Sequence, residues 1–141
     1  MRRILFLEDE PTIREVLAEY MKMQRYEVTE ACDGDEAVAL LKHQNFDLAV
    51  LDIIVPKRSG LEVLAYIRQE YPDMAVIMLT ALDDEQTQVK AFNAYADDYV
   101  IKPVSPLILL KRMETILRRT THNRTSSGIK DQTDRAEQGL S

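Results

Sequence analysis

The sequence of 141 residues contains one cysteine, four glycines and no tryptophan. A single cysteine cannot form an internal disulfide, so a disulfide-rich secreted scaffold is excluded. No glycine-rich phosphate-binding loop appears, and the chain has only four glycines to make one. No apolar run approaches the roughly 18 residues of a membrane span. Because Arg2 and Arg3 precede only four apolar residues, the sequence predicts no signal peptide, and we expect a cytoplasmic protein without membrane contact.

The chain has more acidic than basic residues. It has 18 Lys and Arg against 24 Asp and Glu, a net charge of −6. Residues 120–141 hold three bases and three acids, so the whole excess lies in residues 1–119. This balance argues against a general nucleic-acid surface. The two histidines, His43 and His122, have no ligand spacing around them and indicate neither a metal site nor a catalytic base.

Short apolar runs alternate with amphipathic segments five times along the chain. The runs are typical of strands and the segments have helical spacing. This order predicts an α/β fold, with a parallel sheet covered by helices on both faces. The predicted strands are Ile4–Leu7, Tyr26–Thr29, Leu48–Leu51, Ala75–Leu79 and Tyr99–Ile101. The predicted helices are Pro11–Met23, Glu36–Lys42, Leu61–Glu70, Glu85–Ala94 and Pro106–Arg119, with caps expected at Asp33, Ser59, Asp83 and Asp84.

One domain is expected in residues 1–119. Arg118 and Arg119 suit the negative end of the last helix dipole, so we expect that helix to end there. Residues 120–141 contain only Ile129 and Leu140 as large apolar residues. We interpret them as a flexible tail or linker, too short to be an output domain.

Polar residues follow four of the predicted strands. Glu8 and Asp9 follow the first, Asp52 ends the third, Thr80 ends the fourth and Lys102 ends the fifth. Each alone could be a cap, a turn residue or a solvated charge. In an open parallel sheet, however, sites form at the carboxyl ends of the strands, where these side chains would meet.

Asp52 is the most informative of these residues, because it interrupts an apolar run and an unpaired buried charge is costly. Its neighbours Glu8 and Asp9 add further negative charge, which a cation must offset. A hard divalent ion such as Mg²⁺ binds carboxylates, water and a phosphate oxygen. With Lys102 and the Thr80 hydroxyl facing the same point, the set suits stabilisation of a phosphoryl group in transfer.

These residues resemble the receiver domain of bacterial two-component response regulators over residues 3–119. Each motif is short, but all occur in order on the expected strands. The matching segments are Leu7–Glu10, Asp52–Gly60, Leu79–Ala81 and Ala96–Pro103. The resemblance implies a doubly wound, flavodoxin-like receiver fold with five strands in the order 2-1-3-4-5.

The resemblance also implies a role for each matched residue. Asp52 corresponds to the phosphoacceptor, which takes a phosphoryl group from a sensor histidine kinase. Asp9, Asp52 and the backbone carbonyl of Ile54 would bind Mg²⁺ (or Mn²⁺), and Glu8 would act through water. Lys102 would pair with the phosphoryl oxygens. Such a domain is no enzyme beyond its own phosphorylation and slow dephosphorylation.

Thr80 and Tyr99 correspond to the switch pair, and Pro103 is expected to follow a cis bond. Phosphorylation would draw in the Thr80 hydroxyl, turn the Tyr99 ring inward and change the face formed by the fourth helix, fifth strand and fifth helix. In this family, the residue two after the phosphoacceptor and the residue two after the switch threonine control the access of hydrolytic water. Here these residues are Ile54 and Leu82, whose apolar side chains cannot orient a water. We therefore expect a long-lived acyl phosphate, although both could simply be packing residues.

The segment Asp97–Pro103 and the following helix, which is predicted to end at Arg119, look most like the winged-helix transcription-factor subclass. Members of this subclass form homodimers through the fourth helix, fifth strand and fifth helix. Lys90, Asp97 and Arg112 match charged positions of the dimer interface, but Ile108 stands where an acid is expected. Leu107 and Ile108 lie off the inward stripe of the last helix, which comprises Leu109, Leu110, Met113, Ile116 and Leu117. We expect a more apolar, partly charge-paired dimer, with DNA bound only through an output domain that this chain lacks.

Two further points depend on single residues. Tyr95 stands where the family has glycine, which implies a different helix cap or a strained turn. Cys32, near the end of the second predicted strand, is expected to be a small buried residue.

The sequence leaves two alternative functions open. An aspartate-nucleophile phosphatase would need a second acid two residues after Asp52, where this chain has Ile54. A phosphorylation-independent interaction module is the other alternative, disfavoured by the complete set of site residues.

Overall fold

The computed structural model describes residues 1–130, with side-chain surroundings described as far as residue 119. Strands and helices alternate along the chain. The strands are β1 (Arg3–Leu7), β2 (Glu27–Ala31), β3 (Leu48–Leu51), β4 (Ala75–Thr80) and β5 (Asp98–Ile101). The helices are α1 (Pro11–Met23), α2 (Gly34–His43), α3 (Gly60–Glu70), α4 (Glu85–Asn93) and α5 (Pro106–Lys130).

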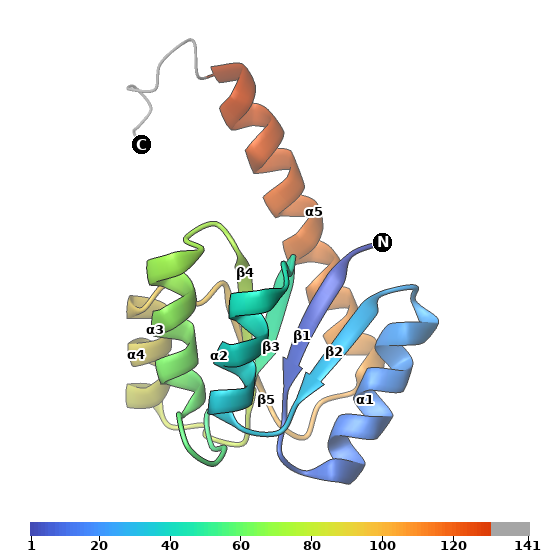
Figure 1. Cartoon of the computed structure of the whole chain (residues 1–141), viewed down its shortest axis with the longest axis vertical. Helices are drawn as coiled ribbons and strands as arrows, with labels where there is room; N and C mark the ends of the chain where they lie inside the picture. Colours follow the sequence, from blue (N-terminus) through green and yellow to red (C-terminus); the bar gives the residue numbers. More distant parts are fainter. Residues whose placement is uncertain (131–141) are drawn as a thin grey trace.

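The five strands form one parallel sheet in the order β2-β1-β3-β4-β5. Helices α1 and α5 cover one face, and α2, α3 and α4 cover the other (Figure 1). The predicted α/β fold, strand order and placement of helices are therefore confirmed. All strand carboxyl ends lie at one edge, where the loops into the helices begin.

Two apolar cores, one on each face of the sheet, hold these layers together. Strands β1, β3 and β4 are buried almost throughout, as expected when a parallel sheet is covered on both faces. The inward stripe predicted for α5 is confirmed: Leu109, Leu110, Met113, Ile116 and Leu117 are all buried. Leu107 and Ile108 lie off the stripe and are exposed.

Side-chain caps fix where the helices begin. Asp33, Ser59 and Asp84 accept hydrogen bonds from backbone N–H groups of the first turns of α2, α3 and α4, as predicted. Ser59 also forms a reciprocal capping box with Glu62. At α1 the cap is Glu10, whose carboxylate accepts from the Ile13 N–H at 2.8 Å. Side chains adjacent in sequence thus fix where the helices begin at this edge of the sheet.

The predicted end of the last helix at Arg119 is wrong, because α5 continues to Lys130. Extension of an existing helix needs no new nucleus, and no proline follows Pro106 in this stretch. Figure 1 shows this part of α5 extending past the sheet, away from the strand carboxyl ends. Residues 131–141, the rest of the predicted tail, lie outside the described residues.

The prediction that Cys32 is buried is also wrong. Strand β2 lies at the edge of the sheet and ends at Ala31, so Cys32 falls in the turn where the helices no longer cover the chain. Its Sγ lies 3.2 Å from Oε1 of Glu36. This hydrogen bond to a carboxylate raises the pKa of the thiol.

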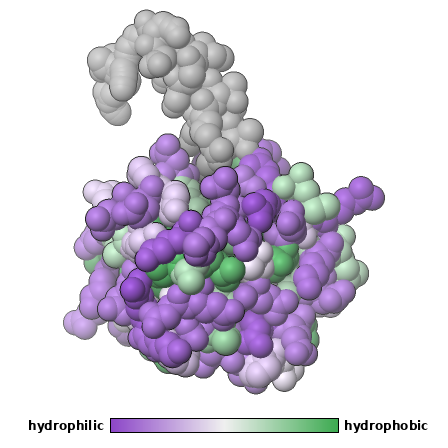
Figure 2. All heavy atoms as spheres, in the orientation of Figure 1, coloured by the Kyte–Doolittle hydropathy of each residue, from purple (hydrophilic) through white to green (hydrophobic). Residues whose placement is uncertain are grey.

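Polar side chains dominate the face shown in Figure 2, and the apolar side chains there form small patches between them. None of the helices among residues 1–130 has the length and apolar character that a membrane span requires.

Candidate functional site

The polar residues predicted at the strand ends meet at one edge of the sheet. Glu8 follows β1, Asp52 follows β3, Thr80 ends β4 and Lys102 follows β5. Glu8 is 1% exposed and Asp52 6% exposed, and Thr80 is fully buried. Because two buried carboxylates cannot lie side by side without compensation, their surroundings determine what the site can do.

The ammonium of Lys102 lies between the two carboxylates. Its Nζ is 2.6 Å from Oε1 of Glu8 and 2.8 Å from Oδ2 of Asp52. Burial alone would lower the pKa of Lys102, but the hydrogen bonds to Asp52 and Glu8 and their negative charges outweigh it, so the pKa is raised. Lys102 is therefore a cation with two acceptors. The Lys102–Pro103 bond is cis, as the resemblance implied.

The second oxygen of each carboxylate is held by the backbone. Oε2 of Glu8 accepts from the N–H of Glu10 at 3.0 Å, and Oδ1 of Asp52 accepts from the N–H of Ile54 at 3.2 Å. Two polar contacts thus orient each side chain. Such preorganisation suits a group that must meet a ligand in one geometry.

A divalent cation fits this site. Carboxylate oxygens of Glu8, Asp9 and Asp52 lie within 4.8 Å of one another. Asp9 is exposed, whereas the other two are buried, so a cation would reach the set from the solvent side. Hard oxygen donors of this kind are what Mg²⁺ prefers. The predicted backbone ligand, the carbonyl of Ile54, lies two residues after Asp52 in the loop that follows β3.

A cavity of about 710 Å³ opens onto the carboxylates. Asp9, Asp52 and Lys102 line its polar part, and Ile13, Val16 and Val104 contribute to its apolar wall. Ile54 also lines it and is 57% exposed. The site is therefore accessible from the solvent.

Two glycines let the loop after β3 approach its neighbours closely. A Cβ at Gly60 would lie 2.0 Å from the Asp52 carbonyl oxygen, and one at Gly34 would lie 1.9 Å from that of Arg58. The Gly34 N–H also donates to the carbonyl of Pro56 at 3.1 Å. The start of α2 therefore braces the loop that follows Asp52.

The proposed switch residues lie on the two neighbouring strands β4 and β5. Thr80 Oγ1 is buried and has no hydrogen-bond partner among the described residues. The ring of Tyr99 is buried, and its hydroxyl donates to the carbonyl of Leu82 at 2.7 Å. Burial is the main cause that raises the pKa of Tyr99, with the negative charges of Asp84 and Asp52 adding to it.

The residues predicted for the dimer face do not join the site. Lys90, Leu107 and Ile108 are exposed. Asp97 and Arg112 already have partners within the chain: Asp97 pairs with Arg68 at 3.1 Å, and Arg112 pairs with Asp98 at 2.9 Å. The carboxylate of Asp97 also accepts from the N–H of Val76.

Tyr95 adopts a positive φ of 70°, so the strained turn expected there is present. The guanidinium of Arg68 donates from Nε and Nη2 to the Tyr95 carbonyl, at 2.9 and 2.7 Å. Sequence reasoning missed this contact, because Arg68 and Tyr95 are 27 residues apart and no local pattern links them.

Residues 4–114 match the family described as the response regulator receiver domain. The chain belongs to this family. Response regulator RR06 of Streptococcus pneumoniae is 43% identical over 116 residues, covering 82% of this chain and 53% of that protein. The transcriptional regulatory protein ResD of Bacillus subtilis is 40% identical over 119 residues, covering 84% of this chain and 49% of ResD. The receiver chain thus spans about half the length of the curated relatives it matches.

Solved structures agree with this membership. A CheY-like receiver domain protein from Methanospirillum hungatei has a TM-score of 0.84 and 31% identity, covering 87% of this chain and 98% of that one. TrrA of Thermotoga maritima, solved in complex with Mg²⁺-BeF, has a TM-score of 0.75 and 38% identity, covering 82% and 99%. The predicted family and fold are confirmed.

Replacement of Lys102 by methionine should destabilise the domain. Without the ammonium, Glu8 and Asp52 remain buried and face each other, so we expect the free energy of unfolding to fall by about 3 kcal/mol. Urea unfolding followed by circular dichroism measures the change. Added Mg²⁺ should stabilise the variant more than the wild type, because it can replace the missing positive charge.

The matched control for this experiment is Lys111→Met on α5. Lys111 is exposed and pairs with Glu114 of its own helix at 3.1 Å. This change should alter the free energy of unfolding by no more than about 0.5 kcal/mol. Equal stability of the Lys102 and Lys111 variants would contradict the compensating role of Lys102.

Proposed function

We propose that Asp52 accepts a phosphoryl group from a phosphohistidine of a sensor histidine kinase, in a Mg²⁺-dependent reaction that switches the α4-β5-α5 face. The observation that carries this proposal is the contact of the Lys102 ammonium with both Asp52 and Glu8, at the floor of an open cavity. Receiver domains are signalling domains rather than enzymes, and the present one catalyses only its own modification.

The chain's own residues supply the nucleophile and part of the charge. A carboxylate oxygen of Asp52 attacks the phosphorus, so that an O–P bond forms while the P–N bond to the histidine breaks. Lys102, already within hydrogen-bond distance of Asp52, pairs with the oxygens of the transferred group. Asp9, Asp52 and the Ile54 carbonyl would hold Mg²⁺, with Glu8 acting through water, and the bound ion would supply further positive charge.

Thr80 and Tyr99 communicate the modification to the α4-β5-α5 face. The buried Thr80 hydroxyl has no partner among the described residues, so an acceptor on Asp52 would satisfy it. The movement of Thr80 changes the loop that contains Leu82, whose carbonyl accepts from the Tyr99 hydroxyl. Tyr99 lies on β5, and its ring is 6.3 Å from that of Phe92 on α4. The signal therefore reaches two elements of the face.

We infer that this face forms a homodimer when the protein is phosphorylated. Leu107 is 68% exposed and Ile108 is 52% exposed. Lys90 is also exposed and matches a charged position of the family's dimer interface. Asp97 and Arg112 are engaged within the chain, so apolar contact would contribute more than new ion pairs. Control of transcription would follow through an output domain of the kind its transcriptional relatives imply, since residues 1–119 form the receiver alone.

Two alternatives are less well supported. An aspartate-nucleophile phosphatase needs an acid two residues after Asp52, and the residue there is Ile54. A phosphorylation-independent interaction module would have no need of a buried Lys102 between two carboxylates, because such a set is costly to bury. We propose that the domain works in the cytoplasm, where a kinase can reach it.

We also propose that the acyl phosphate is long-lived. Ile54 lines the cavity beside Asp52 and is largely exposed, and Leu82 packs partly against the core. Neither side chain can orient an attacking water. The lifetime would then depend on a separate phosphatase.

Incubation with a small acyl-phosphate donor and Mg²⁺ should add one phosphoryl group to the wild type, because Asp52 is preorganised as the nucleophile. Intact-mass spectrometry detects the adduct. Asp52→Asn keeps the shape of the side chain and should remain unmodified. Asp73→Asn, an exposed acid outside the site, should be modified as the wild type is. An adduct that persists in Asp52→Asn would overturn the proposed function.

Ile54→Asn should shorten the lifetime of the phosphorylated protein severalfold, since an amide at the cavity can hold a water near the phosphorus. Loss of the adduct is followed by mass spectrometry after the donor is removed. Ile54→Val keeps an apolar side chain and should lose phosphate at the wild-type rate. A fast wild-type rate that neither change alters would contradict the proposed role of Ile54.

Ile108→Ser should weaken self-association of the phosphorylated protein about tenfold, because it removes apolar area from both halves of a symmetric interface. Sedimentation at several concentrations measures the dissociation constant. Glu114→Ser changes an exposed residue elsewhere on α5 and should leave the constant within about twofold. An unchanged dimer with serine at position 108 would show that the interface lies elsewhere.

A further inference from the structure

Every polar group of Glu8 is held in place, which is unusual for a residue of a three-residue loop. Its N–H donates to the carbonyl of Ala31 on β2 at 3.0 Å. Its two carboxylate oxygens accept from Lys102 and from the N–H of Glu10. The remaining group, the backbone carbonyl, accepts from Nη1 of Arg14 at 2.8 Å.

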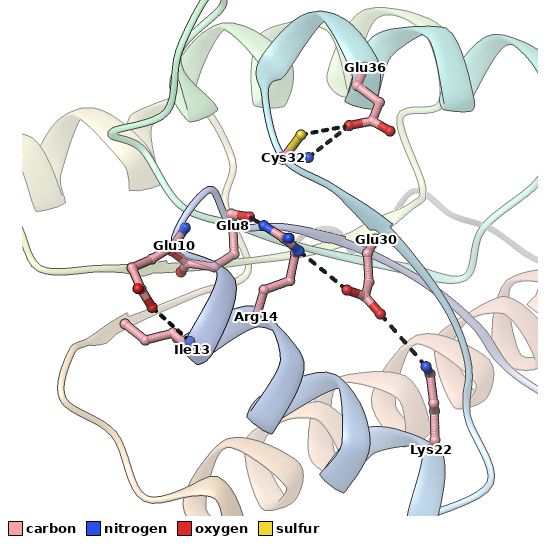
Figure 3. Close-up of polar contacts among 8 residues, drawn as sticks. All are labelled: Glu8, Glu10, Ile13, Arg14, Lys22, Glu30, Cys32 and Glu36. Atoms are coloured by element: carbon pink, nitrogen blue, oxygen red, sulfur yellow. Dashed lines mark hydrogen bonds and ion pairs between the residues drawn. The ribbon is translucent and has the colours of Figure 1, made fainter.

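Arg14 reaches Glu8 from the first turns of α1 and has a second partner on β2. Its Nε donates to Oε1 of Glu30 at 3.3 Å, and the other oxygen of Glu30 lies 3.6 Å from Nζ of Lys22 (Figure 3). The Arg14 side chain is only 18% exposed. The guanidinium is thus clamped between an edge strand and the loop that carries the metal-binding carboxylates.

This clamp adds one more restraint to a short loop that other hydrogen bonds of Glu8 and Glu10 already hold. Only residues 8–10 join β1 to α1, and the exposed side chain of Asp9 lies between two residues that the structure fixes. The orientation of the Glu8 carbonyl sets the peptide plane that leads into Asp9. A guanidinium presents its donors in a rigid planar fork, so its bond to Glu30 determines the direction of its bond to Glu8.

We propose that Arg14 is a positioning residue for the cation site: oriented by Glu30, it fixes the Glu8 carbonyl and so holds the Glu8 and Asp9 carboxylates in the geometry that binds Mg²⁺. This inference rests on the proposed function, because it assumes that these carboxylates bind the ion. It assigns a task to Arg14 and Glu30, which act through Glu8 and do not belong to the carboxylate cluster itself.

The sign of the effect separates positioning from simple electrostatics. A positive charge close to a cation site repels the cation, so removal of Arg14 should tighten Mg²⁺ binding if charge alone mattered. If Arg14 positions the loop, the same change weakens binding despite the lost repulsion. Changes to groups that orient metal ligands cost 10- to 100-fold in affinity. Because Arg14 acts through the backbone, we expect the lower end, about tenfold.

Isothermal titration of the unphosphorylated protein with Mg²⁺ tests the proposal. Arg14→Met keeps an apolar stem and loses the donors, and its dissociation constant should rise about tenfold. Arg14→Lys keeps the charge but has a single donor nitrogen and cannot form the planar fork, so it should rescue part of the affinity. The control Lys22→Met removes a positive charge from the same helix and from the same Glu30, without touching Glu8. It should bind Mg²⁺ as the wild type does, or slightly more tightly.

The outcomes distinguish this inference from the proposed function. Circular dichroism first verifies that each variant is folded. If Arg14→Met does not fold, the milder variant Arg14→Lys replaces it, and its dissociation constant for Mg²⁺ should still exceed that of the wild type. Wild-type or tighter binding by the folded Arg14 variant would overturn the positioning role alone. A wild type that does not bind Mg²⁺ would instead overturn the metal-dependent function on which the inference rests.

Discussion

The contact between one ammonium and two buried carboxylates constrains the rest of this receiver domain. Glu8, Asp52 and Lys102 come from the ends of three different strands, and each would be costly to bury alone. Their pairing is possible only where β1, β3 and β5 end at the same edge of one parallel sheet. The strand order, with β1 and β3 adjacent, brings the two carboxylates together, and a cation from β5 offsets their charge.

The surrounding loops hold the residues of this contact in place. The loop after β3 lies so close to its neighbours that Gly60 and Gly34 have no room for a side chain. The loop before α1 is held by Arg14 and by the Glu10 cap. Backbone hydrogen bonds and close packing thus place carboxylate oxygens that, in a looser loop, would turn toward solvent. The burial of the charges and the rigidity of the loops are two aspects of the same arrangement.

The sequence predicted those parts of the site that depend on strand ends, because parallel strands place successive carboxyl ends together whatever their distance in the chain. Asp52 and Lys102 were found in this way. Arg14 was not, since its partner Glu30 lies 16 residues away on another element and no periodic pattern links the two. The exposure of Cys32 was missed because the residue was expected to pack near the end of the second strand, whereas β2 ends at Ala31 and Cys32 lies in the turn that follows.

Under the proposed function, the coupling between the site and the α4-β5-α5 face rests on one buried hydroxyl. A buried hydroxyl without a partner costs free energy, and Thr80 is in that position while Asp52 bonds to Lys102 and Ile54. Under the proposed function, a phosphoryl oxygen on Asp52 offers the missing acceptor. Movement of Thr80 toward that acceptor would pull on the loop after β4, whose Leu82 carbonyl accepts from the Tyr99 hydroxyl. In the proposed switch, this one missing hydrogen bond links phosphorylation to the α4-β5-α5 face.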